Sequence, residues 1–155
     1  MFRLKWTPRR LKLLLNLYPP YLGAGIRVTH ISPDWRELVV RMNLRWYNRN
    51  AVGAHFGGSL YSMVDPHLML LLMQLLGRDH VVWDQAAKIE FRKPGEGTVT
   101  ARISISDPEL DLIREKTADA QPFRPEFQVN VVDRSGETVA QVTKTLYVRR
   151  RKIAS

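Results

Sequence analysis

Cysteine is absent from the 155-residue sequence. Disulfide frameworks, thiolate zinc sites, iron–sulfur clusters and cysteine nucleophiles are therefore excluded together. The absence also fits a reducing compartment, and we expect a cytoplasmic protein. A chain of this length has room for one domain of ordinary size. Its composition, 45% hydrophobic and 25% charged, is typical of a folded domain rather than a disordered chain.

Long hydrophobic runs are also missing. The longest uninterrupted apolar run is Leu68–Met73, whereas a membrane-spanning helix needs about 20 apolar residues. We therefore expect no transmembrane segment. The leucines at 13–15 follow basic residues, as in a signal peptide, but Asn16 and the Pro19–Pro20 pair interrupt the stretch, so secretion is not expected either.

Acidic residues are absent from both ends of the chain. The terminal segments carry nine cations: Arg3, Lys5, Arg9, Arg10, Lys12, Arg149, Arg150, Arg151 and Lys152. These nine account for the whole net charge of +9, because residues 13–148 hold 15 cations and 15 anions. Two interpretations stay open: solvated ends that keep a neutral body soluble, or a weak electrostatic grip on an anionic membrane surface or a phosphate-bearing ligand. No nucleic-acid partner is expected, because such domains usually carry a basic stripe on the fold itself.

The hydrophobic pattern predicts a helix, two strands, a buried helix and four more strands. Thr7 and Pro8 form an N-cap and first-turn pair, and Pro19–Pro20 ends that helix. Residues 59–76 are apolar on nearly every face, which indicates a helix buried all round. Alternating apolar and polar residues predict six strands, near 26–31, 38–44, 81–94, 98–106, 123–132 and 138–148. The polar segment 107–120 is expected to form a short helix or a loop.

This order predicts an α+β fold, in which an antiparallel six-stranded sheet wraps around a long central helix. We divide the chain into an N-terminal helical extension over residues 1–24, a main domain over 25–148 and a basic C-terminal tail over 149–155.

Three local features then resemble one family. The glycine-rich loop Asn50–Gly58 leads directly into the predicted central helix, and Asp65 follows Gly58 by seven residues. The strand segment Lys88–Pro94 ends in a basic residue before proline. Together with the element order, these features resemble the hotdog-fold acyl-CoA thioesterases, both the phenylacetyl-CoA type and a poorly characterised branch of unknown function. The resemblance implies a homodimer or dimer of dimers, an acyl-CoA or acyl-carrier substrate, and no cofactor beyond the coenzyme A of the substrate.

The start of the central helix is the predicted catalytic region. Unpaired N–H groups at Gly57, Gly58 and Ser59 would polarise a thioester carbonyl. By resemblance, Asp65 would act as general base or nucleophile. The alternative is that Asp65, followed by Pro66, caps a helix that starts there, and a kinked helix would allow both roles.

Other residues are predicted to bind substrate, each with a structural alternative. Asn50, His55 and Phe56 belong to the loop, where turn chemistry or a backbone-bonded histidine would explain them equally well. Arg92 and Lys93 would bind the phosphates of coenzyme A, or serve surface solubility.

The sequence also gives expectations for His67, Asp84 and Lys88. His67 is expected to be structural, and no cluster has the spacing of a metal site. Asp84 and Lys88, four apart in a strand, are expected to face the same side.

The expected function is thioester hydrolysis, and the alternative is a hotdog protein that binds acyl-CoA or lipid without turnover. The alternative draws on two departures from the family pattern, the early position of His55 and the proline after Asp65.

Overall fold

The computed structural model describes residues 6–152. Its elements, in chain order, are α1 (Pro8–Leu17), α2 (Pro19–Ala24), β1 (Ile26–Ile31), β2 (Glu37–Asn43), α3 (Gly57–Ser62), α4 (His67–Leu76), β3 (His80–Phe91), β4 (Thr98–Ser104), α5 (Asp107–Lys116), β5 (Glu126–Val132) and β6 (Thr138–Arg150). The predicted tail residues Arg3 and Lys5 lie outside the described residues. Arg149 and Arg150, which we assigned to the basic tail, are the last residues of β6.

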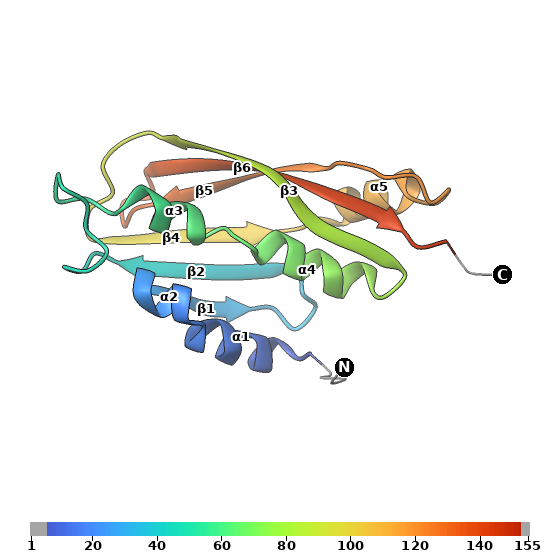
Figure 1. The fold of residues 1–155 in the computed structure, drawn as a ribbon, viewed down its shortest axis with the longest axis horizontal. Coiled ribbons are helices and arrows are strands. Elements are labelled where there is room, and N and C mark those ends of the chain that lie inside the picture. Colours follow the sequence, from blue (N-terminus) through green and yellow to red (C-terminus); the bar gives the residue numbers. More distant parts are fainter. Residues whose placement is uncertain (1–5, 153–155) are drawn as a thin grey trace.

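One sheet of six strands forms the frame of the molecule, in the order β1-β2-β4-β5-β6-β3, with every neighbouring pair antiparallel. Helices α3 and α4 run along one face of this sheet (Figure 1). The apolar positions of the strands alternate with polar ones and turn toward these helices, so the core lies between helix and sheet. The predicted six-stranded antiparallel α+β architecture is therefore confirmed.

The central helix is broken in the middle. Helix α3 ends at Ser62, α4 begins at His67, and the peptide bond between Asp65 and Pro66 is cis. Pro66 has no N–H to donate, so a continuous helix would lose a hydrogen bond there. The whole span Gly57–Leu76 is long and apolar enough to cross a membrane by length and composition, as the core helices of many soluble proteins are, and half of it is buried inside this fold.

The N-terminal helix forms as its sequence predicts. Thr7 caps α1 by accepting a hydrogen bond from the Arg10 amide at 3.3 Å, and Pro8 occupies the first turn. Pro19–Pro20 ends α1 as expected, but the same prolines also begin α2, which we did not predict. Proline suits the first helical position as well as it stops a preceding helix, so the pair is ambiguous in the sequence.

The two edges of the sheet differ in whether another element covers them. Asn16 of α1 hydrogen-bonds both the N–H and the C=O of Val28, at 2.8 and 3.0 Å, on the outer edge of β1. Helix α1 therefore blocks that edge. The opposite edge strand, β3, pairs only with β6 among the described residues, and its central residues Gln85–Lys88 are exposed. The sheet thus has one protected edge and one open edge.

Candidate active site

A buried lysine lies behind the break in the central helix. Lys144 is on β6, and its side chain is only 1% exposed. Its Nζ donates to Asp65 Oδ1 at 2.6 Å and lies 3.0 Å from Asp84 Oδ1. The Tyr61 hydroxyl of α3 lies 3.3 Å from the same Nζ. The break, the open edge strand and β6 therefore bring one cation, two carboxylates and a phenol to one point.

Asp65 does not cap a helix in this structure. The N-cap of α4 is Pro66, and no side chain makes a capping hydrogen bond there. The Asp65 carboxylate instead accepts from Lys144 and, at 3.4 Å, from the Tyr61 hydroxyl. The capping alternative is therefore wrong, because the turn at Pro66 directs the carboxylate toward β6.

Asp84 reaches this cluster because β3 contains a β-bulge. The β3–β6 register shifts between Asp84 and Ala86, so Asp84 pairs with the buried Leu146 while Lys88 pairs with Thr143. The extra residue at Gln85 reverses the alternation, and Lys88 points outward, where it pairs with Glu90 at 2.8 Å. The prediction that Asp84 and Lys88 face the same side is therefore wrong.

Lys144 itself was missed, although the sequence carries a signal for it. In β6, the inward positions 140, 142, 146 and 148 are alanine, valine, leucine and valine, and Lys144 occupies the same row. A lysine in an otherwise apolar row must find acidic partners when it is buried. That pattern could have directed attention to Asp65 and Asp84.

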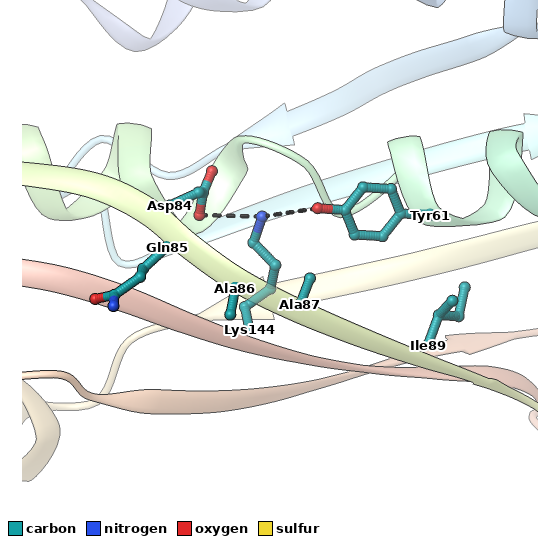
Figure 2. Close-up of a pocket in the computed structure, with 7 residues that line it drawn as sticks. All are labelled: Tyr61, Asp84, Gln85, Ala86, Ala87, Ile89 and Lys144. Carbon is teal, nitrogen blue, oxygen red and sulfur yellow. Dashed lines mark hydrogen bonds and ion pairs between the residues drawn. The ribbon is translucent and has the colours of Figure 1, made fainter.

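A polar cavity opens beside the cluster. It has a volume of about 460 Å³ and is lined by Tyr61, Asp84, Gln85, Ala86, Ala87, Ile89 and Lys144. Figure 2 shows the Lys144 amine between the Asp84 carboxylate and the Tyr61 hydroxyl, with the alanines of β3 beside it. Asp84 is thus the carboxylate that lines the cavity, and Asp65 holds the other side of the ammonium.

Burial and neighbouring charge set the ionisation of the cluster. Burial raises the pKa of Asp84 above its usual 3.8, the contact with Lys144 lowers it, and the charge of Asp65 raises it further. Burial alone would lower the pKa of Lys144, but its bonds to the two carboxylates outweigh burial, and this pKa is raised. The site therefore holds a permanent ammonium next to a carboxylate that takes up a proton more readily than a free aspartate.

A second pocket lies at the loop end of the sheet. It has a volume of about 550 Å³, and five predicted site residues line it: Asn50, His55, Gly57, Arg92 and Lys93. Val52, Leu60 and Phe91 add apolar surface. A Cβ on Gly57 would lie 2.8 Å from the Phe91 ring and one on Gly58 would lie 2.5 Å from the Phe56 ring, so these two exposed rings would have to shift. The predicted Phe56 is exposed beside this pocket, whereas Ser59 is buried.

Hydrogen bonds within the loop occupy several of these polar groups. Asn50 accepts from the amides of Val52 and Ala54, as turn chemistry requires. His55 is buried, and its Nε2 lies 3.0 Å from the Gly97 carbonyl. Burial lowers the pKa of His55, which favours the neutral form of the ring. Both residues therefore shape the loop that forms the pocket.

The two predicted phosphate-binding cations already have acidic partners. Arg92 pairs with Glu90 at 2.7 Å and donates to Gln141 at 3.0 Å. Lys93 pairs with Asp133 at 2.6 Å and with Glu137. A phosphate group at this pocket would compete with these carboxylates.

His67 follows the break and is fully buried. Its Nε2 lies 3.1 Å from the Tyr21 hydroxyl, which also donates to the Asp65 carbonyl at 2.5 Å. This contact joins α2 to the start of α4 and fits the structural role expected for His67. Within residues 6–152, no group of three or more histidine and acidic side chains could hold a metal ion.

The burial of His67 gives a pH-dependent stability. Burial lowers its pKa from 6.5 to about 3. Between these values the unfolded chain binds a proton that the folded chain does not, so stability rises with pH and is lost as pH falls below 6.5. We expect His67→Gln to reduce this loss, by up to about 1.4 kcal/mol per pH unit. Urea unfolding measured from pH 7 to pH 4 checks this, with the exposed His30→Gln as the control variant. Parallel plots of unfolding free energy against pH for wild type and His67→Gln would contradict it.

Comparison with known proteins identifies both family and fold. The family model of a domain of unknown function, DUF4442, matches residues 8–148. No protein of curated function matches the sequence significantly. Among solved structures, a Pseudomonas aeruginosa protein of unknown function, described as a probable thioesterase, shares 16% identity with a TM-score of 0.78, covering 93% of this chain and 97% of that chain.

Two further structures have the same fold. A Haemophilus influenzae thioesterase shares 15% identity with a TM-score of 0.68, covering 94% of this chain and 92% of its own. A mutant of the phenylacetic acid degradation protein of Thermus thermophilus shares 22% identity with a TM-score of 0.57, covering 83% and 97%. The predicted hotdog fold is therefore confirmed.

Proposed function

We propose that this chain, which belongs to the DUF4442 family of domains of unknown function, hydrolyses acyl thioesters. The observation that carries the proposal is the Asp65–Lys144–Asp84 cluster beside a cavity of about 460 Å³. The fold shared with proteins described as thioesterases gives independent support. An acyl-CoA or an acyl-carrier thioester is the substrate class.

The carboxylate that lines the cavity is the general base of this proposal. Asp84 has a pKa raised by burial. Its Oδ1 is buried 3.0 Å from the Lys144 ammonium, and its side chain, 21% exposed, lines the cavity. A water molecule in the cavity would give its proton to Asp84 while its oxygen attacks the thioester carbonyl carbon. The carbon–sulfur bond then breaks, and the leaving thiolate takes up the proton held by Asp84, which restores the carboxylate.

Asp65 and Lys144 position this base. The Lys144 ammonium bridges the two carboxylates and cannot swing away, because its side chain is buried in the core face of β6. Asp65 as the base or nucleophile, which the family resemblance implies, stays a prediction. Its side chain is more exposed than that of Asp84, but it makes the shorter bond to Lys144 and does not line the cavity.

The proposed enzyme is a homodimer joined through β3. The exposed centre of this edge strand borders the cavity, and an unprotected edge favours pairing with a second copy. The amides of Gly57 and Gly58 from the second subunit would then stabilise the oxyanion, as the resemblance implies. Two subunits would thus complete each site.

A charged substitution on this edge should separate the subunits. We expect Ala86→Arg to convert dimer to monomer in size-exclusion chromatography with light scattering, and to lower turnover at least tenfold. Two arginines facing each other across a twofold interface repel and resist burial. Ala118→Arg, on an exposed turn after α5, is the control. A dimeric, fully active Ala86→Arg variant would exclude β3 as the interface.

The direct test of function is thiol release from a panel of short, long and aromatic acyl-CoAs. We expect turnover of at least one member by wild-type protein. Acyl-CoA or lipid binding without turnover is the second candidate, favoured by the ion pairs that occupy both carboxylates. Saturable binding with no thiol release from any substrate would select that candidate.

A further inference from the structure

A hollow lined by arginines lies on the face of the sheet that points away from the central helix. In β1 and β2, the core-facing residues Ile26, Val28, Val40 and Met42 alternate with Arg27, Thr29, Arg41 and Asn43. The hollow has a volume of about 510 Å³ and is lined by Leu22, Gly25, Ile26, Arg27, Thr29, Arg41, Asn43, Arg45, Tyr47 and Arg134. It shares no lining residue with the other two pockets.

The charge in this hollow is unbalanced. Four of its lining residues are arginines, and none is an aspartate or glutamate. None of these arginines takes part in an ion pair within residues 6–152. This is unusual in a body that is neutral overall, where residues 13–148 carry 15 anions for 15 cations.

The strand register places two of the arginines directly opposite each other. Arg27 is the antiparallel partner of Arg41 in the β1–β2 ladder. Like charges at directly opposed positions destabilise a sheet by up to about 1 kcal/mol. The arrangement therefore opposes folding slightly unless an anion lies between the two guanidinium groups.

Hydrogen bonds fix the polar groups at the other side of the hollow. Arg134 donates to Thr98 Oγ1 at 3.0 Å, and Thr98 in turn donates to Asn43 Oδ1 at 2.9 Å. Arg134 thus reaches the hollow from the β5–β6 turn in a defined position.

We propose that this hollow binds a small molecule carrying two or more phosphate groups, such as inorganic pyrophosphate or a pyrophosphate ester. Guanidinium groups bind phosphate oxygens through paired, charge-assisted hydrogen bonds. The volume is in the range of small-molecule sites. Since the unpaired cations are gathered in a hollow rather than along a stripe, a soluble ligand fits better than a nucleic acid or a membrane surface. This inference does not depend on the proposed thioester hydrolysis.

Titration calorimetry with inorganic pyrophosphate at low ionic strength tests the proposal. We expect saturable binding to the full chain, weakened at least tenfold in Arg27→Gln/Arg41→Gln. The same double variant should be as stable as wild type or more stable without ligand, because it removes the opposed charges. Arg149→Gln/Arg150→Gln removes the same charge outside the hollow and should bind like wild type.

Three results would overturn the proposal. Equal loss of affinity in both double variants would show attraction to net charge alone. No saturable binding of pyrophosphate would exclude the ligand class. Arg27- and Arg41-dependent binding of single-stranded RNA, or of phosphatidylcholine vesicles containing phosphatidylserine, without binding of pyrophosphate would assign the hollow to a macromolecular or membrane partner instead.

Discussion

Lys144→Met should destabilise the protein by about 3 kcal/mol at neutral pH. The substitution leaves Asp65 and Asp84 facing each other without the cation that both contact now. Removing one partner of a buried ion pair is costly because the remaining charge keeps its desolvation penalty, and here two charges remain. Part of that cost is relieved by water, since the Asp65 side chain is 40% exposed.

Urea unfolding at two pH values measures this effect. Without the ammonium, burial and the charge of Asp65 raise the pKa of Asp84 with no cation to oppose them. The penalty is therefore largest above that pKa and shrinks as pH falls and Asp84 binds a proton. The triple variant Asp65→Asn/Asp84→Asn/Lys144→Met, which removes all three charges, should recover most of the loss. A Lys144→Met protein as stable as wild type at pH 7 would show that the Lys144 ammonium does not stabilise the fold through Asp65 and Asp84.

Asp84→Asn should lower kcat for the best thioester substrate by about 10²- to 10⁴-fold, with a small effect on KM. An amide cannot accept the proton of the attacking water, but it preserves the shape of the cavity wall. In wild type, kcat should fall on the acid side as Asp84 takes up a proton, with a midpoint above the usual aspartate value of 3.8. That acid limb should disappear from the residual activity of Asp84→Asn.

The control for this variant is Asp111→Asn, which alters an exposed aspartate on α5 that pairs with Arg114 at 3.3 Å. It should keep wild-type turnover and the wild-type pH profile. Thermal unfolding of each variant separates lost chemistry from lost folding. An Asp84→Asn protein with wild-type turnover would remove Asp84 from the mechanism.

Periodicity in the sequence was enough to predict the strands and the buried central helix, because each strand buries one face. It could not reveal the bulge at Gln85, since one extra residue reverses the alternation without any change in composition. Asp84 was therefore assigned to the face of Lys88 and missed as a partner of Lys144. The proline after Asp65 did indicate a break in the helix, and the structure places the break there.

The gathering of distant residues was harder to predict. Lys144 lies 79 positions after Asp65, and the two meet through the packing of the helix break against β6, whose pairing with β3 adds Asp84. Likewise, Arg27 and Arg41 become neighbours through a strand register that no local pattern specifies. The loop residues Asn50 and His55, by contrast, were found from the glycine-rich loop, which is local in sequence.

The central claim is that the carboxylate lining the cavity activates water. The most direct test is to compare kcat in Asp84→Asn and Asp65→Asn at a temperature where both are fully folded. The account predicts that Asp84→Asn loses at least ten times more turnover than Asp65→Asn, because Asp65 acts through Lys144. A larger loss in Asp65→Asn would contradict it and return the role of base to the helix carboxylate.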